Sequence, residues 1–161
     1  MKLYFVEHDF LFLKKNNAIR DETGAVRFDL VREPVVFGYK LHLCDNYGKE
    51  LALIRQKVSL LSNKFIVTID GTEMILTPIA NRKEGFYYEL SVLGWRTFGN
   101  LYECDFAIMS DGQAIANVRK LPHKDGSCCE VTYQDSTKET AILAVAITIE
   151  CAMEVLNNDA D

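Results

Sequence analysis

The sequence lacks most of the signals that mark catalytic and metal-binding proteins. Its three histidines (His8, His42 and His123) form no His-Glu-x-x-His motif, and its five cysteines form no Cys-x-x-Cys pair. No Gly-x-Ser-x-Gly elbow, glycine-rich phosphate loop or dinucleotide fingerprint occurs. These absences predict a protein that is not an enzyme, with no catalytic residues, no cofactor and no metal.

A large basic block, which is typical of nucleic-acid-binding proteins, is also missing. The formal net charge is −5. Residues 1–124 hold 17 Lys and Arg against 15 Asp and Glu, whereas residues 125–161 hold one Lys against eight acids. We therefore expect no nucleic-acid partner.

No apolar run is long enough to cross a membrane. The most apolar stretch, residues 141–156, contains Glu150 and Glu154 and falls short of the roughly 20 residues that a spanning helix needs. Residues 7–9 (Glu, His, Asp) interrupt the apolar core that a signal peptide requires. We therefore expect no transmembrane segment. Because the cysteines are odd in number and irregularly spaced, we also expect reduced thiols and a cytoplasmic location, either free or at the membrane periphery.

The composition is that of one globular domain, residues 1–161, with 48% apolar and 25% charged residues. Apolar and polar residues alternate, as in half-buried strands, over residues 26–30, 39–43, 65–69 and 102–108. Turn signals such as Asp70-Gly71 and Asp111-Gly112 separate these runs. The pattern predicts about twelve short antiparallel strands joined by hairpins.

The C-terminal segment has a different character, with a central helix expected over about residues 137–156. Ser136 and Glu139 have the spacing of a capping box, and residues 141–156 are apolar almost all round. Such a helix must be enclosed, so we predict a mainly β fold, a closed antiparallel barrel around a central hydrophobic helix. The alternative, a sandwich with the helix on one side, would leave half of the helix in water.

The chain resembles the LURP-one-related family, relatives of the tubby C-terminal domain and the phospholipid scramblases. The resemblance covers about residues 3–156 and rests on four stretches: IRDETG at 19–24, LALIRQK at 51–57 followed by SLL at 59–61, FIV at 65–67 with Asp70-Gly71, and the final apolar segment at 141–157. It implies a closed twelve-stranded tubby-like barrel with a central hydrophobic helix.

The resemblance also implies a ligand. Tubby domains bind phosphoinositide headgroups through basic residues on one strand and its loop, and Arg55 and Lys57 fall where such a pair would lie, with Lys64 downstream. Several cations that converge on one point can donate charge-assisted hydrogen bonds to the oxygens of a phosphate group. The implied function is a non-enzymatic intracellular module that binds anionic phospholipid at a membrane surface. The alternative is that these cations are solvated residues of an exterior strand.

Other polar groups are weaker candidates. Arg119, Lys120, His123 and Lys124 form a second basic group, in a loop beside Pro122. Glu150 and Glu154, four residues apart on one helix face, could serve acid–base chemistry or hold a hard cation, or lie hydrated at the barrel mouth. Trp95 is expected in a loop, packed or stacked on a ligand.

Two other function classes remain open. One is a protein-interaction or structural scaffold with no small ligand, which would use strand edges, loops or the acidic C-terminal tail. The other is an enzyme of unknown chemistry, for which Cys128 or Cys129 near His123 would be the nucleophile.

Overall fold

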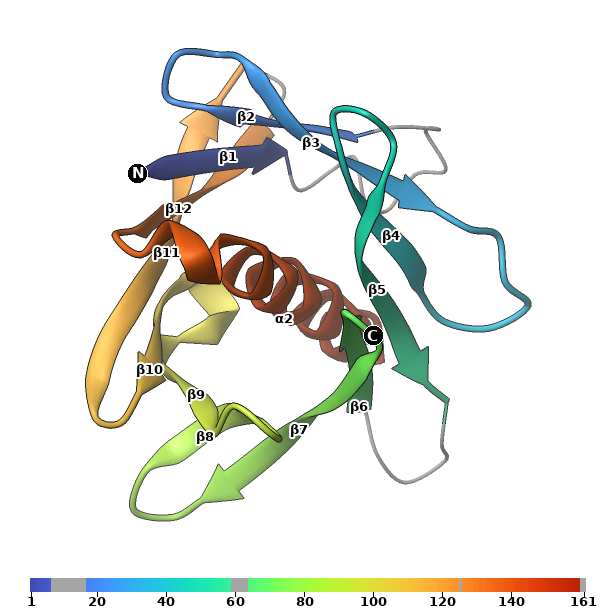
Figure 1. Ribbon diagram of the computed structural model, residues 1–161. Coiled ribbons are helices and arrows are strands. Elements are labelled where there is room, and N and C mark those ends of the chain that lie inside the picture. The colour runs from blue at the N-terminus through green and yellow to red at the C-terminus, as the bar shows by residue number, and fades with distance from the viewer. Residues whose placement is uncertain (7–16, 59–63, 125, 160–161) are drawn as a thin grey trace.

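A computed structural model describes residues 1–6, 17–58, 64–124 and 126–159. In it twelve strands close into one antiparallel barrel, and a long helix runs through the interior (Figure 1). The predicted barrel around a central helix is therefore confirmed, and the sandwich is excluded. Residues 7–9 and the expected loop at 59–61 lie outside the described residues.

The strands pair in chain order. Strand β1 closes the barrel by pairing with β12, with Lys2 opposite Thr132 and Val6 opposite Cys128. The elements are β1 (Lys2–Val6), β2 (Asn17–Asp21), β3 (Val26–Arg32), β4 (Lys40–Asp45), β5 (Glu50–Lys57), β6 (Lys64–Ile69), β7 (Thr72–Asn81), β8 (Gly85–Leu90), β9 (Trp95–Asn100), η1 (Leu101–Glu103), β10 (Asp105–Ser110), β11 (Gln113–His123), β12 (Gly126–Tyr133), η2 (Ser136–Lys138) and α2 (Glu139–Asp159).

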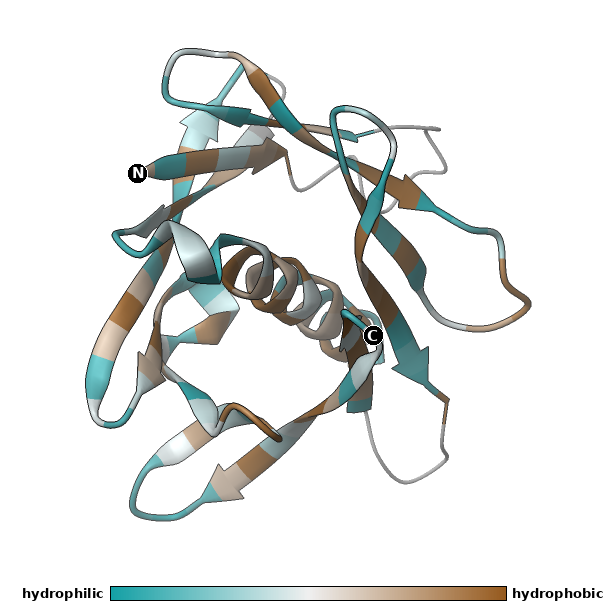
Figure 2. Cartoon of the chain, viewed as in Figure 1, coloured by the Kyte–Doolittle hydropathy of each residue, from teal (hydrophilic) through white to brown (hydrophobic). Residues whose placement is uncertain are grey.

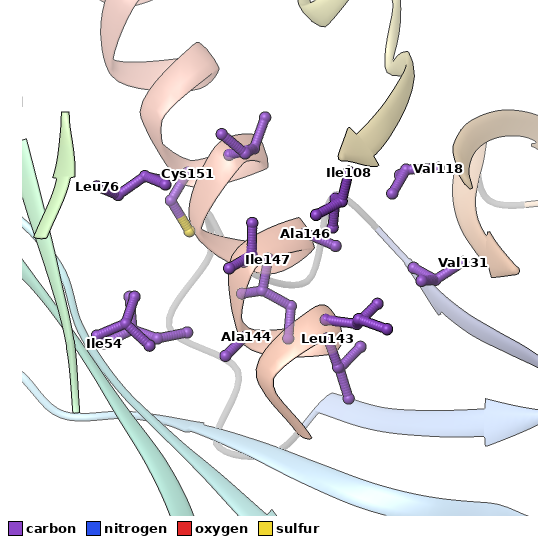
Figure 3. Packing of buried hydrophobic residues seen from close by; sticks show 14 of the residues in the cluster. Ile54, Leu76, Ile108, Val118, Val131, Leu143, Ala144, Ala146, Ile147 and Cys151 are labelled. Carbon is purple, nitrogen blue, oxygen red and sulfur yellow. The ribbon is translucent and has the colours of Figure 1, made fainter. Parts of the chain in front are cut away.

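The core lies between the barrel wall and α2. Residues of α2 from Ile142 to Ile149 are all buried, and the strands turn every second side chain inward toward them. Figure 3 shows Ile54 and Leu76 on one side of the helix and Ile108, Val118 and Val131 on the other. Ala144 and Ala146 are fully buried, and because their side chains are small, the helix backbone can approach the wall closely at these positions.

The alternation of strand direction gives the barrel two ends, at which the connections lie in turn. The helix-start rim holds the turns at residues 22–25, 46–49, 70–71, 91–94, 111–112 and 134–138, and the helix-end rim holds the connections at residues 33–39, 58, 82–84, 101–104 and 124. Near the helix-start rim, Glu139 accepts hydrogen bonds from Tyr133 and Arg27. Near the helix-end rim, the Tyr39 hydroxyl donates to Glu154 over 3.1 Å.

The start of the helix differs from the predicted capping box. Asp135 is the N-cap of a short 3-10 helix that begins at Ser136 and precedes the long helix, and its carboxylate accepts from the Thr137 N–H at 3.0 Å. Residues 136–138 form the short 3-10 helix η2, and α2 begins at Glu139. The Glu139 carboxylate is engaged by Tyr133 and Arg27. The capping-box prediction was wrong because these tertiary partners take up the carboxylate.

Two segments predicted as loops are strands. Strand β11 continues through Pro122 to His123, pairing Pro122 with Ser127 of β12. It can contain a proline because β10 begins at Asp105, opposite Arg119, so the far side of β11 is an edge beyond that point. Trp95 opens β9, pairs with Leu90 and is buried. Among the described residues, no helix has the length and apolarity to span a bilayer.

Candidate functional site

The predicted basic site lies on the outer wall formed by β4, β5 and β6. Ile54 and Phe65 point into the core, so the neighbouring Arg55 and Lys64 point outward. The register places Arg55 opposite Lys40 and Lys57 opposite Lys64. The structure therefore brings the three predicted cations onto one face.

Two of the wall's cations already have acidic partners. The guanidinium of Arg55 donates to Glu73 of β7 over 2.7 Å, and the ammonium of Lys40 lies 2.9 Å from Glu33. Both pairs are partly exposed, so their contribution to stability is small. Each cation is nevertheless neutralised by its acidic partner, so Arg55 and Lys40 attract a further anion only weakly.

Lys57 and Lys64 differ from these neighbours. Within the described part of the chain, neither forms an ion pair with an acid. Directly opposed residues on antiparallel strands have Cβ atoms about 4.5–5.5 Å apart, and like charges there are destabilising. A phosphate group between the two ammonium groups would relieve this repulsion. We call the two residues the lysine pair.

His42 lies on the same wall, between two carboxylates. Its Nε2 is 2.7 Å from Glu33, and its Nδ1 contacts Glu50. Partial burial alone would lower the pKa of His42, but the hydrogen bonds to Glu50 and Glu33 outweigh it and raise that pKa above its usual range. The two carboxylates thus favour the protonated imidazole and hold its ring in a network with Glu33 and Glu50.

An exposed apolar edge lies beside the lysine pair at the helix-end rim. Exposed side-chain fractions are 89% for Val36, 74% for Phe37 and 63% for Val58. The connection is held to β5 because the Gln56 N–H donates to the Tyr39 carbonyl at 2.8 Å. Figure 2 shows the apolar part of the β3–β4 connection on the same side of the barrel as the end of β5. We call Val35, Val36, Phe37 and Val58 the apolar edge.

Gly38 explains why this connection lies so close to β5. Its φ is +79°, and a Cβ there would come within 2.7 Å of Gln56 Oε1. Only glycine accepts that conformation and contact without strain. The apolar edge is therefore fixed beside the end of β5, next to Lys57.

The helix-start rim is acidic by comparison. Its turns carry Asp21, Asp45 and Asp135, whose carboxylates accept backbone N–H groups two residues on. These hydrogen bonds explain the aspartates as turn residues. Their charge also makes the end opposite the lysine pair unfavourable for an anionic partner.

One member of the second basic group, Arg119, is part of the wall's structure. The Arg119 Nε donates to Glu130 over 2.6 Å, and Glu130 is only 3% exposed although it faces outward. Tyr4 and Lys2 also donate to this carboxylate, and the hydrogen bond to Glu130 raises the pKa of Tyr4 to about 12. Arg119 therefore compensates a buried acid.

The two helix acids do not act as a pair. Glu154 accepts from Tyr39, whose ring also lies 4.7 Å from the Arg32 guanidinium carbon. Glu150 lies instead beside the thiols of Cys104 and Cys129. The four-residue spacing was a poor guide because each carboxylate meets a different part of the barrel wall.

Sequence reasoning missed the apolar edge. Its signal was available, since Val35, Val36 and Phe37 stand between Pro34 and Gly38, where a turn-flanked loop is usually polar. The ion pair between Arg55 and Glu73 could not be found from spacing, because the two residues lie on strands separated by β6.

Comparison with known proteins gives one informative result. No family model matches the chain, and no curated protein matches it. Among solved structures, it is similar to the X-ray structure of protein AT5G01750 from Arabidopsis thaliana, with a TM-score of 0.57 and 16% sequence identity. The match covers 90% of this chain and 88% of the plant protein. The two proteins therefore share a fold over nearly their whole lengths.

Proposed function

We propose that this chain is a LURP-one-related, tubby-like protein, a non-enzymatic module that binds anionic phospholipid headgroups at a cytoplasmic membrane surface. The family assignment is supported by the sequence resemblance and by the fold shared with the plant protein. The observation that carries the function is the lysine pair, Lys57 opposite Lys64, placed beside exposed Val36 and Phe37.

Charge and apolar surface would act together in this binding. A lysine near an anionic membrane contributes about 1 kcal/mol, so two lysines alone bind weakly. Burying a Phe side chain contributes about 1.5–3 kcal/mol more, and Phe37 is free to enter the interfacial region because it is mostly exposed. The acidic helix-start rim then faces away from the membrane. Binding of this kind is weak and salt-sensitive.

Co-sedimentation with vesicles tests the proposal. The protein is mixed with vesicles of phosphatidylcholine alone, with added phosphatidylserine, or with added phosphoinositide, at low and at physiological salt. We expect pelleting with anionic vesicles that weakens as salt rises. Equal pelleting with neutral vesicles, or none at low salt, would contradict it. A preference for phosphoinositide at equal vesicle charge would identify the headgroup.

Matched variants locate the binding surface. Lys57→Glu combined with Lys64→Glu should abolish pelleting. Lys49→Glu combined with Lys138→Glu makes the same change of charge at the helix-start rim, the end of the barrel away from the lysine pair, and should retain most of it. Arg55→Ala should have a small effect, because that guanidinium is engaged by Glu73. Equal losses in both double variants would show that only net charge matters.

A protein-interaction scaffold is the second candidate, and the β8–β9 seam favours it. The two strands pair only at Glu89–Arg96 and Leu90–Trp95, and beyond that the Tyr88 N–H donates to the Thr97 side chain. A hollow of about 460 Å³ lies between residues 83–87 and 96–99, and exposed Phe98 forms part of its lining. The seam would accept an extended peptide segment as an added strand.

The two candidates predict different effects of mutation. Phe98→Ser should weaken capture of an extended peptide and leave vesicle pelleting unchanged. Phe37→Ser should do the opposite. Loss of pelleting in Phe98→Ser would place the membrane contact at the seam and contradict the assignment to the lysine pair.

A further inference from the structure

Three side chains that bind metals in other proteins meet inside the barrel. Cys104 follows η1, Cys129 faces inward from β12, and Glu150 projects from α2. The two sulfur atoms are 3.2 Å apart, and the ligand atoms of all three residues lie within 4.8 Å of one another. No spacing in the sequence links these residues. The register of β10, β11 and β12 places the start of β10 across β11 from Cys129, with Asp105 opposite Arg119 and Arg119 opposite Glu130, and the enclosed helix adds Glu150.

The surroundings make this cluster unlike a chance surface group. Cys104 is 2% exposed and Cys129 is fully buried. Glu150 is partly buried and follows a stretch of α2, from Ile142 to Ile149, in which every residue is buried and none is charged. A charged carboxylate in such a position is costly unless a positive group or hydrogen bonds compensate it.

The backbone of Cys104 has an unusual conformation. Its φ of 50° and ψ of 50° lie in the left-handed region, which glycine, asparagine and aspartate normally occupy. That conformation ends η1 and is accompanied by burial of the thiol against Cys129. A cysteine held in a strained conformation, with its sulfur beside a second thiol, suggests a role for the sulfur itself.

We propose that Cys104, Cys129 and Glu150 form a binding site for a borderline divalent cation, with Zn²⁺ as the expected ion. Zinc is bound by cysteine sulfur and by carboxylate oxygen in tetrahedral geometry, and the three side chains supply three of four positions. Two sulfurs bound to one zinc ion lie about 3.8 Å apart, so the thiols must separate by about 0.6 Å.

The binding step balances without any change of oxidation state. Each thiol loses its proton to solvent as an S–Zn bond forms, and the carboxylate oxygen supplies the third bond. Two protons are released for each ion bound. The ion would fasten η1 and β12 to the enclosed helix, so we expect it to stabilise the barrel rather than to act in catalysis.

Titration of the reduced, metal-free protein with Co²⁺ tests the site, because Co²⁺ occupies zinc sites and thiolate coordination gives it a strong near-ultraviolet charge-transfer band. We expect one Co²⁺ per chain, with this band, and displacement by Zn²⁺. The band should disappear in Cys104→Ser and in Cys129→Ser. Glu150→Gln should weaken affinity by about tenfold or more, since even the loss of an outer-shell partner of a metal site costs about 10–100-fold.

Cys128→Ser is the matched control, since it makes the same replacement at the next residue of β12, on the other face of the wall. It should keep the band. Should the Ser variants fail to fold, the wild-type protein still decides, because Zn²⁺ should raise its melting temperature and a chelator should reverse the rise. Absence of the band, absence of the thermal shift, or isolation of a Cys104–Cys129 disulfide that persists in reductant would overturn the proposal.

Discussion

Lys57 and Lys64 occupy directly opposed positions on β5 and β6, so two positive charges share one register position on the outside of the barrel. Their neighbours Lys40 and Arg55 are each held by a carboxylate, from Glu33 and Glu73 respectively. The wall is therefore neutralised along most of its length and remains positive at the helix-end rim, where the apolar edge lies.

Removing this repulsion should stabilise the fold. Lys57→Glu replaces a like-charged pair with an opposite-charged one, which should raise the free energy of unfolding by about 0.2–1 kcal/mol. Urea denaturation measures the change, with Lys49→Glu as the control at an exposed turn. Under the proposed function, the same variant should bind anionic vesicles less well. Destabilisation by Lys57→Glu would show that the two lysines do not repel each other.

The network around His42 should make stability depend on pH. The folded-state pKa of His42 is raised above 6.5, so its contribution is complete below about pH 6.5 and is lost as the pH rises through the folded-state value. We expect the difference in urea midpoint between wild type and His42→Gln to shrink over that range. Both proteins contain the other histidines, so the contribution of those residues to the pH dependence cancels in the difference. A difference that grows with pH would contradict the geometry with Glu33 and Glu50.

The enclosed helix should tolerate truncation poorly. Leu143 is fully buried in α2, so Leu143→Ala should lower the free energy of unfolding by about 2–5 kcal/mol. Leu156→Ala, the same substitution at a half-buried position near the end of the helix, should cost clearly less. Urea denaturation of both variants gives the comparison. Equal costs would mean that the helix is not enclosed as described.

Gly99 should be harder to replace than Gly24, although both have a positive φ. A Cβ there would lie 2.6 Å from the Asp105 carbonyl oxygen, at a φ of +128°. Gly24 also has a positive φ but has open space around it. We expect Gly24→Ala to cost about 1–2 kcal/mol from the backbone conformation alone and Gly99→Ala to cost more. Thermal or urea unfolding of the pair decides, and the reverse order would contradict the close approach of β9 and β10.

The barrel was predictable from the sequence because its signals are local and consistent. Short alternating runs separated by Asp-Gly turns specify hairpins, and an all-round apolar helix has to be enclosed. Predictions failed where a distant partner decides the outcome. Glu139 does not complete the predicted capping box because Tyr133 and Arg27 engage its carboxylate, and the N-cap of the preceding 3-10 helix η2 is Asp135 instead of Ser136. Strand β11 runs through Pro122 because β10 begins only opposite Arg119.

The candidate site was predictable only in part, for the same reason. Strand alternation places Arg55 and Lys57 on one face, and the hairpin brings Lys64 beside them. Which of the three is neutralised depends on Glu73, two strands away. The meeting of Cys104 with Cys129 likewise depends on the register of β10, β11 and β12, which the spacing of the cysteines does not encode.

The most direct test of the membrane contact is the fluorescence of a Phe37→Trp variant. The chain has one tryptophan, Trp95, which is only 4% exposed, so the new indole dominates any response to a lipid surface. We expect a blue shift with anionic vesicles and quenching by brominated lipids. A Phe98→Trp variant at the β8–β9 seam should show neither. Vesicle binding without a change at position 37, or with the change at position 98 instead, would contradict the assignment of the membrane contact to the lysine pair and the apolar edge.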